Sequence, residues 1–248
     1  MKTSDSRHPP PAQLTWAYFL DVDGTLVNIA DTPQGVVVDM LLRELIANLS
    51  IASGGAVALV SGRMISDLQN LIRLPQLPLA GLHGLERRDS TGRLWIHAAP
   101  PAAKQAMKLA LAPLVAAHPG LILEDKGLTL AMHYRMVPAL ASYVHQTMRR
   151  LLKSNDQGLE LQCGRRVVEI KPAGIDKGTA IAEYLAESPF KGRRPVFIGD
   201  DLTDEHGFAE VNLLHGISIK VGQGASCARY RLPSVAVVRR WLEQGLSG

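Results

Sequence analysis

Two acidic turns, each following a short apolar run, hold the residues of this sequence most suited to chemistry. The first turn is Asp21-Val22-Asp23-Gly24-Thr25, after residues 16–20, and the second is residues 199–204, after residues 195–198. Their carboxylates belong to Asp21, Asp23, Asp200, Asp201 and Asp204. Carboxylates gathered at the ends of two buried strands repel one another without a cation, and such hard oxygen ligands suit Mg²⁺. The sequence therefore predicts a metal-assisted enzyme.

The first turn has simpler interpretations that the motif alone leaves open. A D-x-D-G sequence occurs in ordinary turns, because Asp and Gly both favour them. A calcium loop is disfavoured, because it requires a bidentate Glu at its twelfth position and the twelfth residue from Asp21 is Thr32. If the turn keeps extended geometry, Asp21 and Asp23 face the same pocket, since residues two apart in a strand point to one side.

A hydroxyl and a cation elsewhere in the chain could bind an anion. Ser61-Gly62-Arg63 follows the apolar run 56–60 and opens a predicted helix, where free backbone amides attract anions. A Ser at this position is more often a simple N-cap, and a lone Lys is usually solvated. The start of a helix is nevertheless unfavourable for a cation, so Lys177, directly after Gly174-Ile175-Asp176, is expected to act outside its own helix.

The elements that must position these residues alternate between strands and helices at both ends of the chain. The predicted strands are 16–20, 56–60, 77–82, 196–198 and 217–221, and the predicted helices are 37–49, 65–72, 177–186, a short one after Thr203, and 238–246. Repeated strand–helix–strand units predict a parallel sheet with right-handed crossovers. Ligands bind beyond the carboxyl ends of such strands, where Asp21, Ser61 and Asp200 are expected.

The middle of the chain has a different pattern. Two predicted hairpins, 121–126 with 128–134 and 159–163 with 166–170, alternate with helices over 102–117 and 139–153. We expect an α/β fold, with a Rossmann-like, doubly wound parallel sheet as its core and an inserted α+β cap domain. The predicted core is 13–98 and 172–248, the cap is 99–171, and the proline-rich residues 1–12 are a disordered tail.

Taken together, the motifs D-V-D-G-T-L at 21–26, S-G-R at 61–63, Lys177 and G-D-D-L-T-D at 199–204 resemble the four ordered motifs of the haloacid dehalogenase superfamily phosphatases. The resemblance implies Asp21 as nucleophile and Asp23 as general acid and base, with Ser61 and Lys177 on the phosphoryl group. It also implies Mg²⁺ held by Asp21, the Asp23 carbonyl and Asp200, supported by Asp201 and Asp204. The second Asp of the first motif favours phosphoryl transfer over dehalogenation, because only the former requires a proton carrier.

Further segments, from Phe19 to about Leu242, resemble the trehalose-6-phosphate phosphatase family. They are G-L-H-G-L-E at 81–86, E-D-K at 124–126, H-Y-R at 133–135, V-E-I-K-P at 168–172 and G-I-D-K-G at 174–178. This resemblance implies that Glu124, Lys126 and Glu169 contact the sugar from the cap. Its other candidate substrate contacts are Asn28, Arg63 and His83. Glu124 and Lys126 could instead form an exposed cross-strand charge pair, which the sequence leaves open.

Composition narrows the classes of partner but does not decide the function. The net charge of +4 comes from scattered basic pairs, so a nucleic-acid partner is not expected. The sequence has no signal-peptide core and no apolar run long enough for a membrane span, and its two cysteines suit a reducing compartment. We expect a cytoplasmic enzyme acting on trehalose 6-phosphate, with a monomer as the working expectation. Another sugar phosphatase, a phosphomutase and a catalytically silent sugar-phosphate sensor remain alternatives.

Overall fold

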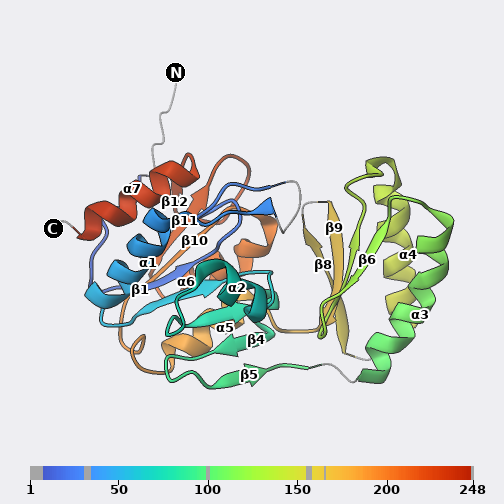
Figure 1. The fold of residues 1–248 in the computed structure, drawn as a ribbon, viewed down its shortest axis with the longest axis horizontal. Helices are drawn as coiled ribbons and strands as arrows, with labels where there is room; N and C mark the ends of the chain where they lie inside the picture. The colour runs from blue at the N-terminus through green and yellow to red at the C-terminus, as the bar shows by residue number, and fades with distance from the viewer. Residues whose placement is uncertain (1–7, 31–34, 99–100, 155–157, 165, 247–248) are drawn as a thin grey trace. The chain divides into compact units, whose positions relative to one another are not determined.

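The structure is a computed structural model that describes residues 8–30, 35–98, 101–154, 158–164 and 166–246 (Figure 1). The chain divides into two compact units. The core unit runs to Trp95 and resumes at Asp176, and the cap unit is Ile96–Ile175. Each unit has its own hydrophobic core.

The core unit is built on an eight-stranded sheet with the order β12-β11-β10-β1-β2-β3-β4-β5. The bounds of its strands are β1 Ala17–Leu20, β2 Val57–Val60, β3 Leu79–Gly81, β4 Glu86–Arg88, β5 Leu94–Ile96, β10 Pro195–Gly199, β11 Ile217–Val221 and β12 Tyr230–Leu232. The pairs from β12 to β3 are parallel, and β4 runs antiparallel to β3. The strand order reverses between β1 and β10, so the turns that follow these two strands flank the switch point where ligands bind in such sheets.

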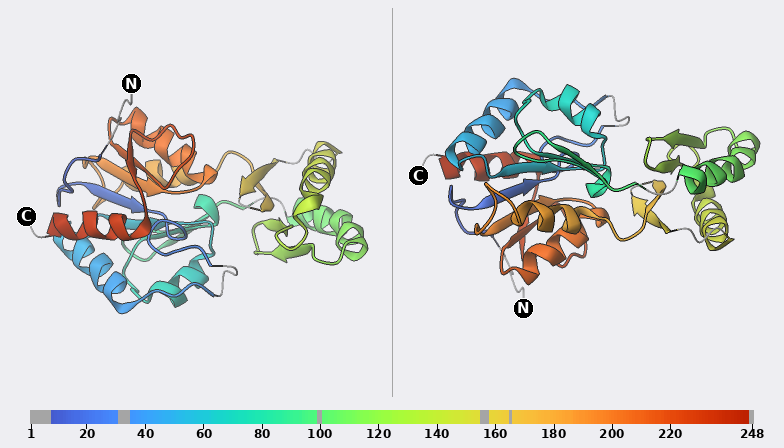
Figure 2. Two further views of the ribbon diagram at one scale, coloured as in Figure 1. Left: turned by 90° about the horizontal axis from the view of Figure 1, so that it is seen from above. Right: turned by 90° about the horizontal axis from the view of Figure 1, so that it is seen from below.

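Helices cover both faces of this sheet. Helices α1 (Met40–Ala52), α2 (Ile65–Ile72) and α7 (Val235–Leu246) pack on one face, and α5 (Lys177–Leu185) and α6 (Glu205–Leu213) on the other. Figure 2 shows the blue helix α1 and the orange helix α6 on opposite sides of the strands. The predicted α/β class with a doubly wound, mainly parallel sheet is confirmed.

Several element boundaries differ from the sequence prediction. Helix α1 begins at Met40 instead of residue 37, because the Asp39 carboxylate accepts a hydrogen bond from Leu42 N (2.7 Å) and so caps the helix there. Helix α7 begins at Val235 instead of residue 238. The prediction also missed β4, β5 and β12, which have only three residues each, too few for an alternating pattern.

The cap unit is a four-stranded antiparallel sheet with two long helices. Its strands are β6 Ile122–Asp125, β7 Leu130–His133, β8 Leu159–Gly164 and β9 Val167–Pro172, in the order β6-β7-β9-β8. Helices α3 (Pro101–Ala117) and α4 (Ala141–Ser154) both lie on the same side of the sheet (Figure 1). There Met107 and Met148 of the helices pack with Met132 and Val168 of the strands. The opposite face of the sheet carries the alternate residues, most of which are polar.

The amino-terminal segment is only partly described. Residues 1–7 of the predicted disordered tail lie outside the described residues. Within residues 8–12, the Pro10 carbonyl accepts a hydrogen bond from Trp241 Nε1 (3.0 Å), which joins this part of the chain to α7. Of the helices in the described part of the chain, none has the length and apolarity needed to cross a membrane.

Candidate active site

The turn after β1 is shaped by its glycine. Gly24 has φ of +86°, a conformation that L side chains rarely adopt, and its N–H donates to Val27 O (2.7 Å). A Cβ atom at Gly24 would lie 2.2 Å from Asp200 Oδ2, so only glycine permits this approach of the two acidic turns. The backbone N–H of Asp21 donates to Ile198 O of β10 (3.0 Å), which fixes the first turn against the strand before the second.

Lys177 joins the two turns through a buried ion pair on each side. Its Nζ atom lies 2.8 Å from Asp21 Oδ1 and 2.6 Å from Asp204 Oδ1. Lys177 is the first residue of α5, whose N-cap is Asp176, the acceptor of a hydrogen bond from Thr179 N (2.9 Å). The capping carboxylate satisfies the helix start, so the lysine side chain is available to neutralise carboxylates that come from β1 and from the turn after β10.

Asp204 organises the second turn from within. Its Oδ2 atom accepts hydrogen bonds from the backbone N–H groups of Asp200 (2.8 Å) and Asp201 (2.9 Å), while Oδ1 accepts from Lys177. The Asp201 side chain caps its own turn by accepting from Leu202 N (2.7 Å). Lys220 of β11 donates to the Asp200 carbonyl. Most of these contacts are made to backbone N–H and carbonyl groups of the turn. None of them uses the Asp200 side chain.

Three carboxylates form a candidate cation site. One oxygen each from Asp21, Asp200 and Asp204 lies within 4.8 Å of the others. Asp200 Oδ1 is buried and has no hydrogen-bond partner among the described residues. A buried, unpartnered carboxylate oxygen beside two further carboxylates fits a hard divalent cation such as Mg²⁺, which prefers oxygen ligands. The cluster brings together Asp21 and Asp200, predicted as ligands, and Asp204, predicted to support them, and these roles stay predictions.

The electrostatics of the cluster reflect three carboxylates around one ammonium. Burial raises the pKa of Asp21 well above its usual range, helped by the Asp204 and Asp200 charges and opposed by Lys177. Burial and the neighbouring Asp204 and Asp201 carboxylates raise the pKa of Asp200 to about 7. The excess of negative charge thus favours protons or a cation in this site.

Arg63 lies on Asp23 in this structure. Its Nε and Nη2 atoms donate to Asp23 Oδ2 (2.6 Å) and Oδ1 (2.7 Å), which is a two-point contact. Ser61, buried at the end of β2, accepts a hydrogen bond from Arg63 N (3.2 Å). The predicted S-G-R segment therefore reaches the first acidic turn, with Arg63 on Asp23 and Ser61 at the base of the same loop.

The two remaining core candidates lie in different surroundings. His83 has φ of +60°, and a Cβ atom at Gly62 would lie 2.6 Å from its ring, so the histidine packs on the Ser61-Gly62 loop. Its backbone N–H donates to Ser61 O (2.9 Å). Asn28 is exposed after the first turn. The sequence predicted both as substrate contacts, and these roles stay predictions.

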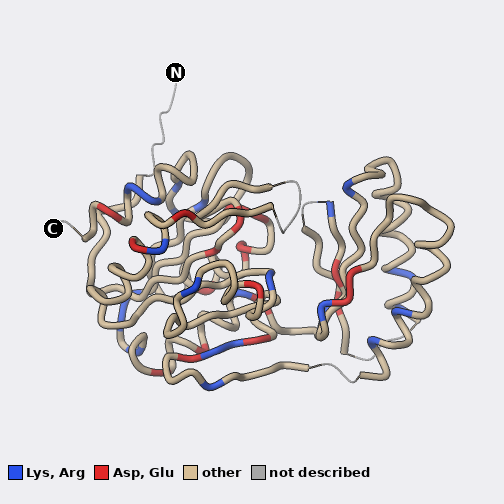
Figure 3. The backbone as a smooth tube through the Cα atoms, viewed as in Figure 1, with Lys and Arg blue, Asp and Glu red and all other residues tan. Residues whose placement is uncertain are grey.

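The cap candidates lie on the helix-free face of the cap sheet. Glu124 of β6 and Glu169 of β9 flank Ala131 in the strand register, and Figure 3 shows red segments on these strands. Lys126 Nζ lies 3.7 Å from Glu169 Oε2, and Glu124 Oε2 lies 2.7 Å from His133 Nε2. The hydrogen bond from His133 is the main reason that the pKa of Glu124 is lowered. The sequence left open a charge pair between Glu124 and Lys126. In the structure Lys126 pairs with Glu169, and Glu124 pairs with His133.

Sequence reasoning missed some of the polar residues that hold the candidate site. Lys220 was not singled out, although a lysine within the mainly apolar strand I-S-I-K-V is a recognisable signal. Thr129, which donates to Glu169 Oε1 in the cap, lies in a turn and had no signal in the sequence.

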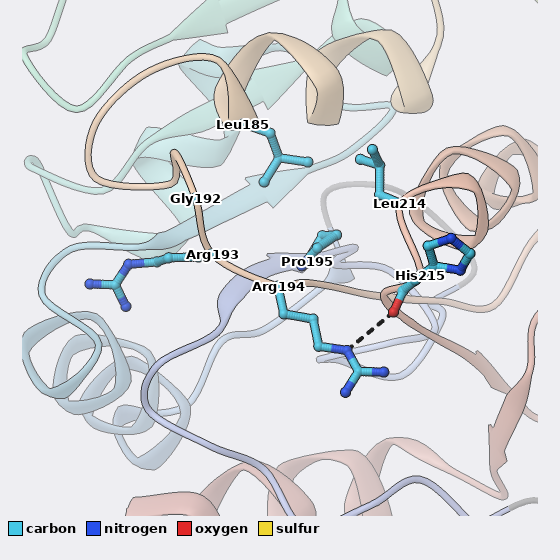
Figure 4. Close-up of a pocket in the computed structure, with 7 residues that line it drawn as sticks. All are labelled: Leu185, Gly192, Arg193, Arg194, Pro195, Leu214 and His215. Atoms are coloured by element: carbon cyan, nitrogen blue, oxygen red, sulfur yellow. Dashed lines mark hydrogen bonds between the residues drawn. The ribbon is translucent and has the colours of Figure 1, made fainter.

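A separate pocket lies at the other end of β10, at Pro195. It has a volume of about 670 Å³ and is lined by Leu185, Gly192, Arg193, Arg194, Pro195, Leu214 and His215 (Figure 4). Arg194 Nε donates to His215 O (3.2 Å) across it. The pocket contains none of the predicted site residues, and it lies at the amino end of its strand, away from the acidic turns.

The chain is similar to proteins of one known family. The trehalose-phosphatase family model matches residues 19–236. The chain is 44% identical over 234 residues to a trehalose-6-phosphate phosphatase of Escherichia coli (strain K12), covering 94% of this chain and 88% of the relative. It is 43% identical over 227 residues to a probable trehalose-phosphate phosphatase of Sinorhizobium fredii, covering 90% and 85%.

Solved structures give the same architecture. The C-terminal domain of C. albicans trehalose-6-phosphate phosphatase superposes with a TM-score of 0.84 at 20% identity, covering 93% of this chain and 92% of that one. At this identity the likeness shows the fold. The sequence matches show the family: this chain belongs to the trehalose-phosphatase family.

Proposed function

We propose that this protein is a Mg²⁺-dependent phosphatase that hydrolyses trehalose 6-phosphate to trehalose and phosphate, the last step of trehalose biosynthesis. The observation that carries the proposal is the buried Asp21–Lys177–Asp204 arrangement beside Asp200. Family membership supplies the substrate, since the named relatives are trehalose-phosphate phosphatases. We place the reaction in the cytoplasm, and the free thiols of Cys163 and Cys227 suit a reducing compartment.

In the proposed reaction the Asp21 carboxylate attacks phosphorus and the sugar oxygen leaves. The product is an aspartyl-phosphate, which water then hydrolyses, so that one difficult step becomes two easier ones. Lys177 and Ser61 bind the phosphoryl oxygens and stabilise the charge that develops on them. The support for Asp21 as nucleophile is its position at the carboxyl end of the central strand β1, with Lys177 2.8 Å away.

Asp23 transfers the protons of both steps. It protonates the leaving sugar oxygen and later accepts a proton from the attacking water. In this structure both oxygens of Asp23 accept hydrogen bonds from Arg63, so a proton on Asp23 requires release of one of these bonds. Arg63 would then turn toward the phosphate or the sugar, in keeping with its predicted role as a substrate contact.

Asp21, Asp200 and the Asp23 carbonyl would hold Mg²⁺, with Asp201 and Asp204 supporting them. When bound, the cation neutralises the carboxylate cluster and polarises the phosphoryl group for attack. Asp204 is a poorer candidate ligand than Asp200, because both of its oxygens already accept hydrogen bonds from Lys177 and two backbone N–H groups.

Sugar recognition falls to the cap residues Glu124, Lys126 and Glu169. Carboxylates accept hydrogen bonds from sugar hydroxyls, and an ammonium donates to them. A disaccharide, which has many adjacent hydroxyls, requires both kinds of partner. Glu169 supports this assignment, because it is only 4% exposed while Lys126 and Thr129 both approach its carboxylate. Asn28 and His83 are the candidate contacts from the core.

The test is phosphate release from a panel of sugar phosphates, with Mg²⁺ present or chelated. We expect trehalose 6-phosphate to be the preferred substrate and chelation to abolish its hydrolysis. Asp21→Asn, which is nearly isosteric but not nucleophilic, is expected to fold normally and to lose turnover. A preference for another sugar phosphate would indicate a different sugar phosphatase, and return of phosphate to sugar would indicate a mutase. Ligand binding without any phosphate release would indicate a sensor.

A further inference from the structure

Gln162 of the cap sheet is a buried polar side chain that the proposed reaction does not yet use. It is 9% exposed, and its Nε2 atom is buried with no hydrogen-bond partner among the described residues. Buried polar groups in proteins are nearly always hydrogen-bonded, because an unmatched donor loses its bonds to water without replacement. An unmatched donor at this position therefore requires an explanation.

The strand register places Gln162 in line with the cap residues proposed to read the sugar. Across the sheet, Gln162 of β8 lies opposite Glu169 of β9, Glu169 lies opposite Ala131 of β7, and Ala131 lies opposite Glu124 of β6. Residues directly opposite in an antiparallel sheet project from the same face. The four residues thus form one row, here called the polar row, on the face that carries no helix.

The members of the polar row offer complementary hydrogen-bonding groups. Glu124 and Glu169 are acceptors when ionised, whereas the amide nitrogen of Gln162 is a donor. Thr129 and Lys126 already approach the Glu169 carboxylate, whereas the Gln162 amide nitrogen has no partner among the described residues.

We propose that Gln162 is a substrate-binding residue whose side-chain amide donates a hydrogen bond to a hydroxyl oxygen of the sugar. This inference rests on the proposed function, because it assigns a further contact to the same sugar-phosphate site. A sugar hydroxyl both donates and accepts, so it can accept from Gln162 while it donates to Glu169. The amide then contributes to substrate specificity. A substrate without an acceptor at this place leaves the amide buried without a hydrogen bond and binds less tightly.

A packing role and a ligand-binding role for Gln162 predict opposite effects of an apolar replacement on the stability of the protein. If Gln162 were retained for packing or for a bond within the sheet, an apolar replacement would destabilise the protein. If its amide awaits a ligand, a side chain of the same length without polar atoms keeps the packing and removes the unmatched donor. Gln162→Met is therefore expected to leave the melting temperature of the protein without substrate unchanged or higher. Residues retained for function are often not the ones that give the most stable fold.

The experiment compares wild type, Gln162→Met and the control Gln105→Met, which changes an exposed glutamine on α3 of the same unit. Three readouts are taken: kcat/KM for trehalose 6-phosphate, kcat/KM for 4-nitrophenyl phosphate, and the melting temperature without substrate. For Gln162→Met we expect a loss of roughly threefold to tenfold on the sugar phosphate, from one neutral hydrogen bond, and a change of less than about twofold on the aryl phosphate. The control is expected to match wild type in all three.

A second variant guards against an unexpected folding defect. Gln162→Asn keeps the carboxamide but withdraws it by one methylene, so it is expected to lose activity on the sugar phosphate and not on the aryl phosphate. Unchanged sugar-phosphate kinetics in both variants, equal losses on the two substrates in both variants, or a clear fall in the melting temperature of Gln162→Met would overturn the assignment.

The proposed function can fail separately. If wild type prefers a sugar phosphate other than trehalose 6-phosphate, the proposed substrate is wrong, and the selective loss in the Gln162 variants is then measured on the preferred substrate. A wild-type enzyme that hydrolyses the aryl phosphate but no sugar phosphate would overturn both proposals.

Discussion

Asp204 and Asp200 show how identical side chains in one turn acquire different tasks from their contacts. Asp204 is fully buried and accepts hydrogen bonds on both oxygens, from Lys177 and from two backbone N–H groups. Asp200, four residues earlier, has a buried oxygen with no partner among the described residues. Asp204 therefore organises the turn, whereas Asp200 has a free oxygen that suits a cation.

Lys177 is expected to be essential for stability as well as for activity. Lys177→Met would leave the Asp21 and Asp204 carboxylates buried without their shared cation. Breaking a buried pair in this way costs about 3–5 kcal/mol. Urea unfolding without Mg²⁺ should therefore show a large loss in the free energy of unfolding, while Lys191→Met, at an exposed position, should show little change. Equal unfolding free energies for the two variants would contradict the structural role of Lys177.

Asp23 is expected to matter most when the leaving group is poor. Asp23→Asn should reduce hydrolysis of trehalose 6-phosphate by about a hundredfold or more, because a sugar alkoxide must be protonated as it leaves. An activated aryl phosphate needs less protonation, so its hydrolysis should fall much less. The measurement is kcat for both substrates. Equal losses would remove Asp23 from the general-acid role and would point to its contact with Arg63 as the important one.

At the scale of the elements, one carboxylate accepts most of the side-chain hydrogen bonds in the turn between β4 and β5. Asp89, in the turn between these strands, accepts hydrogen bonds from Thr91 N (2.9 Å), Thr91 Oγ1 (2.7 Å), Arg93 N (3.0 Å) and Trp95 Nε1 (3.0 Å). Arg87 of β4 then anchors the edge by pairing with Glu183 of α5 (2.7 Å). Such an edge needs a stable turn because its strands are short.

The turn gives the core unit a predictable acid sensitivity. Although burial opposes the shift, the hydrogen bonds from Trp95 and Thr91 lower the pKa of Asp89 from its ordinary value of 3.8 to about 2. A lowered pKa means that the stabilisation is present above the unfolded value and is lost as the pH falls through the folded one. The wild type should therefore lose stability between about pH 4 and pH 2 through this group.

Asp89→Asn tests this directly. The variant should be less stable than wild type at about pH 7, and the difference in unfolding free energy should shrink as the pH approaches about 2. The measurement is urea unfolding followed by tryptophan fluorescence across that range, with Glu44→Gln at an exposed position as the control. A difference that does not depend on pH would show that the Asp89 carboxylate is not the group responsible.

At the scale of the whole molecule, the two units are expected to divide chemistry from recognition. Replacing Glu124, Lys126 or Glu169 by Ala should lower kcat/KM for trehalose 6-phosphate by roughly tenfold to a hundredfold, through lost charged hydrogen bonds. Hydrolysis of a small aryl phosphate should barely change, because that substrate has no sugar to contact. Comparable losses on both substrates would indicate damaged folding, and unchanged sugar-phosphate kinetics in all three variants would refute the sugar site.

Much of the fold could be predicted because its signals are local. The strands before both acidic turns are continuous apolar runs, and the helices of both units repeat with helical period, so their existence and order were predictable. The three-residue strands β4, β5 and β12 were not, because they are defined by pairing with a neighbouring strand. The start of α1 depended on which residue caps it, and only the contact of Asp39 with Leu42 N decides that.

The sequence by itself determined which residue types meet at the carboxyl ends of β1, β2 and β10. Parallel strands bring those ends to one edge, so Asp21, Ser61 and Asp200 had to lie near one another. Only the tertiary structure decided how the charges pair: Lys177 with Asp21 and Asp204, Arg63 with Asp23, and Lys126 with Glu169. The physical reason is that a side chain's partner depends on distances between segments far apart in the chain, which local sequence patterns do not encode. For the same reason, Gln162 could be recognised as a candidate substrate contact only from the strand register, which places it opposite Glu169.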